Sequence, residues 1–376
     1  MKVAFAGGGT GGHVYPALSV AAALRRAVAA PEPLDLLYLG VRGKADGDLV
    51  QREGIAYRAI SAGPLRVGSV TGSARGGLRL LRGVAEASRI LREFRPDLLF
   101  ATGGYGSVGA GLAARLLRLP LLLFLPDVEA GLAVRLLGRF AGRIAVSVPP
   151  ALASVPSAKG VVTGYPVRPA FFEAERAAAR ARLGLHAALP TLLVSGASSG
   201  AASLNRAVAA FAPDFLRVGQ LLHLSGAADE GWLQAERERL PDQLRERYHL
   251  YAYLHDDMAQ ALAAADLAVM RAGASTLGEL PAARLPAVLV PGEYEGWDQS
   301  PNARYLEGEG AAVMLPQSRL GELQPVVMGL LGDGGRREAM KEALGRLAQP
   351  EAAARLAALV CELAGRPQAA SVRGAA

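Results

Sequence analysis

The sequence contains a single cysteine, Cys361, so it cannot form an internal disulfide. No charged and apolar leader precedes the first predicted strand, which begins directly after Met1. Arg118 and Pro120 interrupt the longest apolar run, 116–125, which falls short of the roughly 20 residues that span a bilayer. No group of histidines and cysteines has metal-ligand spacing. These absences predict a cytoplasmic protein with no disulfide, no membrane span and no metal.

Positive charge is concentrated in the first half. Residues 1–160 hold 20 lysines and arginines against 10 acidic residues, whereas 161–376 hold 21 against 24. This excess predicts an anionic partner, and a mixed basic and apolar stretch at 65–95 favours a membrane surface over a solvated helix face. Nucleic acid is not expected, because aromatic residues are not interleaved in 65–92. The stretch contains Arg66, Arg75, Arg79, Arg82, Arg89, Arg92 and Arg95 with Leu65, Val67, Leu78, Leu80, Leu81 and Ile90.

Apolar strand candidates alternate with helical patterns along the whole chain, which predicts an α/β fold with parallel sheets. At 376 residues, two domains are expected. We predict two Rossmann-like, doubly wound domains facing a cleft, at 1–163 and 164–348, then a C-terminal helix at 349–365 and a disordered tail at 366–376. The predicted strands are 2–6, 35–39, 97–101, 121–125 and 144–148, and then 191–195, 220–224, 249–253, 266–270 and 287–290.

The most informative motif is the glycine-rich run 7–12, which lies between the first strand and a helix signalled by Pro16. Glycines let the backbone approach a ligand, and the helix directs its N–H groups and positive dipole end into the same space. His13 then lies at the mouth of an anion or sugar pocket. Imidazole titrates near neutral pH, so His13 is a candidate base for a sugar hydroxyl, with a plain helix-start residue as the alternative.

The same run satisfies G-x-G-x-x-G through Gly7, Gly9 and Gly12. Arg42 follows the second strand and could hold a 2′-phosphate, so an NADP-dependent oxidoreductase is an alternative.

Polar residues of the second half point to a sugar nucleotide. Glu279 is expected in the first turn of a helix, where it could accept hydrogen bonds from a ribose diol or simply favour the helix dipole. The segment 298–302, Asp-Gln-Ser-Pro-Asn, is expected in a polar loop suited to sugar hydroxyls. The acidic pairs at 46/48 and 256/257 have turn and helix-cap settings, so we predict structural roles for them.

Taken together, these residues resemble the MurG family of glycosyltransferases, which transfer N-acetylglucosamine from UDP to membrane-bound lipid I in peptidoglycan synthesis. The most specific segment is 8–16, and 102–105, 166–168, 256–258 and 273–287 also match. The resemblance implies a GT-B fold with UDP-N-acetylglucosamine on the second domain and lipid I on the first. It also implies a peripheral protein at the cytoplasmic face of the cell membrane, with no cofactor.

The resemblance further implies which residues form the site. His13 would be the catalytic base, with Asp127 sharing or replacing it in that role. Acceptor-binding residues would be Gly103, Gly104, Tyr105 and Asp127. Donor-binding residues would be Thr10, Gly11, Gly12, Arg168, Ser198, Ala274, Ser275, Thr276, Glu279, Asp298 and Gln299, with Glu279 on the ribose diol.

Three departures from the family pattern keep alternatives open. Residues 124–127 read Phe-Leu-Pro-Asp where the family has His-Glu-Gln-Asn, Ser199 replaces a glutamine, and Asp298 replaces the first residue of a Gln-Gln pair. The alternatives are a glycolipid-forming transferase with another acceptor or sugar, and a lipid-binding scaffold without turnover.

Overall fold

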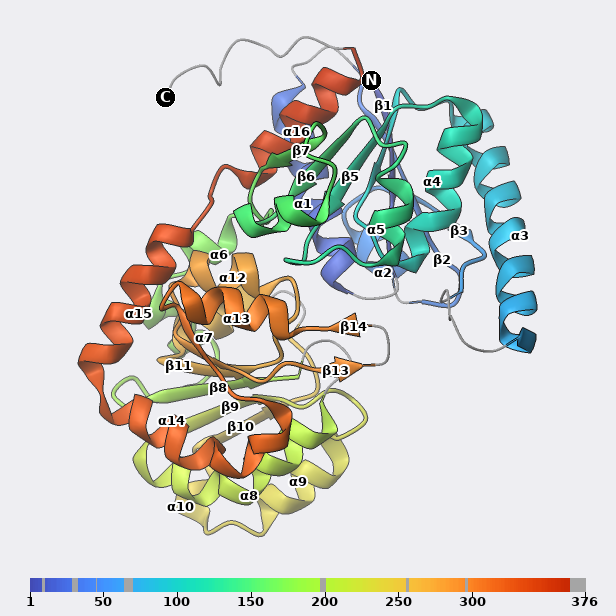
Figure 1. Cartoon of the computed structure of the whole chain (residues 1–376). Helices are drawn as coiled ribbons and strands as arrows, with labels where there is room; N and C mark the ends of the chain where they lie inside the picture. Colours follow the sequence, from blue (N-terminus) through green and yellow to red (C-terminus); the bar gives the residue numbers. More distant parts are fainter. Residues whose placement is uncertain are drawn as a thin grey trace. The chain divides into compact units, whose positions relative to one another are not determined.

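A computed structural model describes residues 1–8, 11–28, 33–44, 46–63, 70–196, 201–254, 257–294 and 297–365. The chain forms two compact units, one of Met1–Val167 with the C-terminal segment from Glu351, the other of Arg168–Pro350. Each unit is built on a parallel sheet covered by helices (Figure 1). The predicted α/β fold with two parallel sheets is therefore confirmed.

The first unit contains a seven-stranded sheet in the order β3-β2-β1-β4-β5-β6-β7. Its strands are β1 (Lys2–Ala6), β2 (Asp35–Val41), β3 (Ala56–Ile60), β4 (Leu98–Ala101), β5 (Leu121–Leu125), β6 (Arg143–Val146) and β7 (Gly160–Val162). Its helices are α1 (Gly11–Ala27), α2 (Asp46–Arg52), α3 (Val70–Phe94), α4 (Tyr105–Leu117), α5 (Leu132–Leu137), the 3-10 helix η1 (Pro149–Ser154) and α16 (Ala352–Leu363). The C-terminal α16 packs on α1, which joins the end of the chain to this unit.

The second unit has a six-stranded sheet in the order β10-β9-β8-β11-β12-β15 and a small hairpin, β13-β14. The strands are β8 (Thr191–Ser195), β9 (Gln220–Leu224), β10 (Tyr248–Tyr251), β11 (Leu267–Met270), β12 (Ala287–Leu289), β13 (Glu293–Tyr294), β14 (Trp297–Asp298) and β15 (Ala312–Met314). The helices are α6 (Ala170–Glu173), α7 (Arg176–Arg182), α8 (Ala202–Val218), α9 (Glu230–Glu238), α10 (Asp242–Arg245), α11 (Met258–Ala264), α12 (Thr276–Ala283), α13 (Ser300–Gly308), η2 (Gln317–Glu322), α14 (Leu323–Gly332) and α15 (Gly334–Leu347).

The strand order of each sheet indicates where a ligand is expected to bind. The order reverses between β1 and β4 in the first unit and between β8 and β11 in the second. In each unit the chain first adds strands on one side of β1 or β8 and then crosses to the other side. Ligands of open parallel sheets bind beyond the carboxyl ends of the strands at such reversal points. The loops after β1, β4, β8 and β11 are therefore the positions where a site is expected.

The sequence prediction found the inner strands of both sheets and missed β3, β7 and β15 at their edges. Inner strands are covered on both faces and read as continuous apolar runs, as in the fully buried β5. In β3, by contrast, exposed and partly buried residues alternate and only Ile60 is buried. An edge strand of this kind has no apolar run to reveal it.

The first helix begins earlier than predicted, at Gly11 instead of near Pro16, so His13 lies within its first turn. Proline has no N–H group, so Pro16 cannot donate the helical bond to the Gly12 carbonyl. The Tyr165 hydroxyl donates to that carbonyl instead, at 3.4 Å. A residue 153 positions away thus compensates for a proline inside the helix.

None of the helices in the described ranges is both long and apolar enough to cross a bilayer.

Candidate functional site

His13 lies where the carboxyl ends of β1 and β4 meet. Its Nδ1 is 2.9 Å from the Thr102 carbonyl oxygen, and the Thr102 hydroxyl donates to the His13 carbonyl at 2.7 Å. Because a carbonyl oxygen can only accept, Nδ1 carries the proton of the neutral imidazole. The lone pair therefore lies on Nε2, which can accept a proton from a substrate hydroxyl.

Two glycines after β4 leave space around this imidazole. Gly103 and Gly104 have φ values of 82° and 70°, a conformation that disfavours side chains. A Cβ atom on Gly104 would lie 2.9 Å from His13 Nε2. Any side chain at position 104 would therefore occupy the space in front of the candidate base.

Asp127 follows β5 at the same edge of the sheet and is partly buried. Since β5 pairs in parallel with β4, the segments that follow these two strands leave the sheet at the same edge. The two residues that replace the family's first polar positions, Phe124 and Leu125, belong to β5 and are buried. Phe124 packs edge-to-face on Tyr165, with ring centroids 6.0 Å apart, so it acts as a core residue.

The remaining predicted residues of the first unit lie around α1 and α4. Gly12 is in the first turn of α1, and Tyr105 begins α4. Gly11 begins α1. Thr10, and Ser198 of the second unit, lie outside the described residues.

In the second unit, Glu279 lies in the first turn of α12, as predicted. Burial raises the pKa of Glu279 to about 7, although a hydrogen bond with Ser275 and the charge of Arg168 act in the opposite direction. Ser275 is the N-cap of α12 and Ala274 precedes it. The Thr276 hydroxyl donates to the Gly273 carbonyl at 2.7 Å, which fixes the turn into the helix. The structure thus brings Arg168, Ser275 and Glu279 together.

The segment 298–302 is not the polar loop that we predicted, because Ser300 and Asn302 belong to α13 and are buried. Gln299 is also buried, and its Oε1 accepts from the Gly292 N–H at 2.8 Å. Asn302 donates to the Ala272 carbonyl at 3.0 Å. Gln299 and Asn302 therefore support the backbone of neighbouring loops.

Asp298 alone of this segment is exposed. Its Oδ1 accepts from the Ser300 N–H at 2.8 Å, at the start of α13. Burial acts to raise the pKa of Asp298, but the bonds to Ser300 and the charge of Arg304 lower it overall. Asp298 therefore stabilises the N-terminus of α13.

The acidic pairs have structural positions. Asp46 begins α2 and is buried, with Oδ2 2.2 Å from where a Gly8 Cβ would lie. Asp257 pairs with Arg182 at 2.6 Å, and Asp256 is not among the described residues. Within the described ranges, histidine, cysteine and carboxylate side chains form no group of three that could hold a metal.

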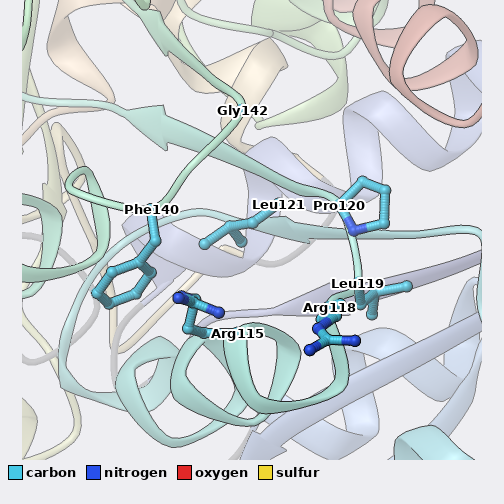
Figure 2. A pocket seen from close by; sticks show the side chains of 7 residues that line it. All are labelled: Arg115, Arg118, Leu119, Pro120, Leu121, Phe140 and Gly142. Atoms are coloured by element: carbon cyan, nitrogen blue, oxygen red, sulfur yellow. The ribbon is translucent and has the colours of Figure 1, made fainter.

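A cavity of about 320 Å³ lies at the opposite, amino edge of the first sheet. Figure 2 shows Arg115 and Arg118 at the end of α4 with Phe140 nearby. The cavity is lined by Arg115, Arg118, Leu119, Pro120, Leu121, Phe140 and Gly142. Because ligands of parallel sheets react at the carboxyl edge, this cavity is distinct from the candidate active site.

Comparison with known proteins agrees with this geometry. The family models for the glycosyltransferase family 28 N-terminal and C-terminal domains match residues 3–146 and 191–356. The two parallel-sheet units thus define a glycosyltransferase of the GT-B class.

Relatives that match over nearly their full length show which family of glycosyltransferases this is. A UDP-N-acetylglucosamine--N-acetylmuramyl-(pentapeptide) pyrophosphoryl-undecaprenol N-acetylglucosamine transferase from Roseiflexus sp. (strain RS-1) is 41% identical, over 97% of this chain and 95% of the relative. The protein of the same name from Symbiobacterium thermophilum is 37% identical, over 97% and 96%. The crystal structure of Acinetobacter baumannii MurG matches with a TM-score of 0.70 and 25% identity, over 96% of this chain and 99% of that one. The chain belongs to the MurG family.

A more distant structure, UDP-GlcNAc 2-epimerase from Neisseria meningitidis bound to UDP-GlcNAc, has a TM-score of 0.65 at 13% identity, over 96% of this chain and 100% of that one. At that identity the likeness shows the shared fold alone. Family membership confirms the prediction that the protein is a transferase. It does not support the alternative of an NADP-dependent oxidoreductase.

Proposed function

We propose that this protein transfers N-acetylglucosamine from UDP-N-acetylglucosamine to the N-acetylmuramyl hydroxyl of the undecaprenyl-pyrophosphoryl pentapeptide acceptor, lipid I. The acceptor oxygen attacks the anomeric carbon, the bond from that carbon to the diphosphate oxygen breaks, and UDP leaves. A single displacement of this kind inverts the anomeric centre. The full-length relatives carry this activity in their names.

The first unit supplies the base in this proposal. His13 Nε2 accepts the hydroxyl proton while the bond from Nδ1 to Thr102 holds the ring in the required tautomer. Gly103, Gly104 and Tyr105, which follow β4, line the acceptor side together with Asp127, which follows β5. The single observation that carries the assignment is the His13–Thr102 hydrogen bond, because it fixes which nitrogen is basic.

The second unit holds the donor. Glu279 accepts hydrogen bonds from the two hydroxyls of the ribose, while Ser198, residues 274–276 and Arg168 bind the nucleotide diphosphate. Asp298 is the exposed member of its segment and faces solvent for a sugar contact. The N-terminus of α12 adds a positive dipole end that favours the leaving diphosphate.

The first test is release of UDP from UDP-N-acetylglucosamine in the presence of a lipid I analogue. We expect release only when both substrates are present, and much less release from UDP-glucose. Release with a different membrane acceptor and none with lipid I would favour another glycolipid product. Donor binding without release under any condition would favour the scaffold alternative.

Helix α3 is the proposed contact with the cytoplasmic face of the membrane. Leu78 and Leu81 are 70% and 68% exposed, and a spacing of three residues puts them on one face of the helix. Arg79 and Arg82 beside them are also exposed. Ile90 is buried, so our assignment of it to this surface was wrong. Leu65, Arg66 and Val67 lie outside the described residues, as does the side chain of Arg75.

Two contacts hold α3 firmly on the first unit. Glu86 of α3 accepts from the N–H of Ser61, which follows β3, at 2.6 Å. A Cβ on Gly83 would lie 2.0 Å from the Ser61 carbonyl oxygen, so only glycine allows this close approach. The exposed leucines are therefore presented by a helix with a fixed position on its sheet.

Replacing Leu78 and Leu81 together with serine should weaken binding to vesicles that contain phosphatidylglycerol by about tenfold or more, because two leucine side chains no longer enter the bilayer. Co-sedimentation measures the bound fraction. Val218→Ser, at an exposed apolar residue of α8, is the matched control and should bind as the wild type does. Equal binding by the double variant would contradict the assignment of α3.

A further inference from the structure

Thr102 makes three hydrogen bonds that join β1, β4 and the first turn of α1. It directly follows β4 and is fully buried. Its N–H donates to the carbonyl of Ala6, the last residue of β1, at 3.0 Å. Its carbonyl oxygen accepts from His13 Nδ1 at 2.9 Å, and its hydroxyl donates to the His13 carbonyl at 2.7 Å. In this reciprocal pair, the side chain of each residue bonds to the backbone carbonyl of the other.

The two bonds between Thr102 and His13 constrain different parts of the histidine. The bond to Nδ1 orients the imidazole ring, whereas the bond from the hydroxyl holds the backbone from which the ring extends. The methyl group of threonine restricts rotation about χ1, so the hydroxyl stays in place. Together the two bonds fix where Nε2 lies at the carboxyl edge of the sheet. A reacting group misplaced by about 1 Å can cost a factor of about 10² in rate.

Gly7 leaves the space that the Thr102 hydroxyl occupies. A Cβ atom on Gly7 would overlap Thr102 Oγ1 and would lie 3.3 Å from the His13 carbonyl oxygen. Gly106, in the first turn of α4, approaches the same point, because a Cβ there would lie 2.8 Å from the Gly7 carbonyl oxygen. Packing against Thr102 therefore accounts for the first glycine of the G-x-G-x-x-G match without a dinucleotide phosphate.

Thr163 is a comparable residue elsewhere in the same sheet. It directly follows β7 and is 1% exposed. Its hydroxyl donates to the carbonyl oxygens of Val146 and Gly164, at 3.4 and 3.2 Å. Both threonines thus direct a buried hydroxyl at backbone carbonyls after a strand of the first sheet. The bond of Thr102 ends on His13 and those of Thr163 do not, so Thr163 serves as an internal comparison.

We propose that Thr102 is a positioning residue for the transfer reaction, because its hydroxyl holds the backbone of His13 where Nε2 can meet the acceptor hydroxyl. The proton moves from the acceptor hydroxyl to His13 Nε2, and Thr102 exchanges no proton with the substrate. This inference deepens the proposed function and rests on it, because it assumes that His13 is the base.

The test compares kcat, measured as UDP release with the lipid I analogue, for three substitutions of Thr102. Thr102→Ala leaves a void and Thr102→Val fills the volume, but neither side chain can donate a hydrogen bond. Both should lower kcat by roughly 10- to 100-fold and change the affinity for UDP-N-acetylglucosamine by less than about twofold. Thr102→Ser restores the donor and should keep kcat within about threefold of the wild type. Thr163→Val is the matched control and should leave kcat unchanged.

A second comparison, in the His13→Ala background, separates positioning from a general effect on the fold. Once the imidazole is gone there is no base to position, so Thr102→Ala should lower the residual kcat by less than about twofold. An equal fall in both backgrounds would show that Thr102 acts through the fold alone and would overturn the inference. A loss in Thr102→Ser as large as about tenfold would also overturn it. The serine variant lacks one methyl group, so this arm does not depend on whether the other two variants fold.

The result for His13→Ala distinguishes this inference from the proposed function. If His13→Ala loses turnover while folded Thr102→Ala and Thr102→Val keep it, the inference is wrong and the proposed function stands. If His13→Ala keeps full turnover, another group is the base, and both the assignment of His13 and this inference are contradicted.

Discussion

Replacing His13 with alanine is expected to lower kcat by about 10²–10⁴-fold, the range for loss of a general base, while the affinity for UDP-N-acetylglucosamine stays within about twofold. The donor nucleotide is assigned to the second unit, so its binding does not depend on the imidazole. Single-turnover rates with a lipid I analogue, together with donor titrations, measure the two quantities separately.

Gly104→Ala tests the same base without removing it. The added methyl carbon would lie 2.9 Å from His13 Nε2, and φ at this position is 70°. The imidazole must therefore move or stay blocked, and kcat should fall while donor affinity is unchanged. Gly76→Ala is a suitable control, because a Cβ there meets no atom within 4 Å.

A His13→Ala variant with nearly full turnover would show that another group accepts the proton. Asp127 is then the next candidate, since it follows β5 at the same edge of the sheet. The double variant His13→Ala/Asp127→Asn would be inactive in that case.

The second large effect concerns Glu279, whose pKa burial raises to about 7. Only the ionised carboxylate accepts both hydroxyls of the ribose. Affinity for UDP-N-acetylglucosamine should therefore rise about tenfold between pH 6 and pH 8. Glu279→Gln should bind the donor more weakly at pH 8 and lose this pH dependence. Donor titrations across that range measure it, with Asp298→Asn as a carboxylate control that keeps the slope.

The pH dependence of protein stability is an independent test of the raised pKa of Glu279. The folded-state pKa of Glu279 is raised from 4.5 to about 7, so folding favours the protonated form. The protonated carboxyl therefore contributes to the free energy of unfolding. This contribution is fully present below pH 4.5 and is lost as the pH rises through 7. Glu279→Gln should therefore be more stable than the wild type at pH 8, by up to about 3 kcal/mol, and no more stable at pH 4.5. Equal melting temperatures at pH 8 would contradict the raised pKa.

Much of the fold was predictable because local sequence decides it. The inner strands are buried on both faces, so runs such as Leu121–Leu125 reveal them without any tertiary information. The turn from β11 into α12 was equally visible, with Glu279 in its first helical turn. Edge strands such as β3 were not predicted, because several of their side chains are exposed or only partly buried and the sequence therefore shows no continuous apolar run.

A residue's place in the fold was predictable where it depends on its own strand and turn, whereas its hydrogen-bond partners were not predictable where they lie far away in the sequence. Gln299 and Asn302 read as ligand contacts in a polar segment, yet each is buried and bonds to loop backbone. The bond from the Thr102 hydroxyl to His13 gave no signal in the sequence, because the two residues lie 89 positions apart. Only the order of strands in the sheet brings them together.

The sequence by itself determined the two parallel-sheet domains, the glycine loop with His13 and the first turn with Glu279, because short-range periodicity and turn chemistry encode them. Only the tertiary structure decided which nitrogen of His13 is protonated and how far the pKa of Glu279 is raised. The proton on His13 Nδ1 is set by a carbonyl 89 positions away, and the raised pKa of Glu279 comes from its burial. Protonation and charge depend on what surrounds a group in space, and in a parallel sheet those surroundings come from strands far apart in the chain.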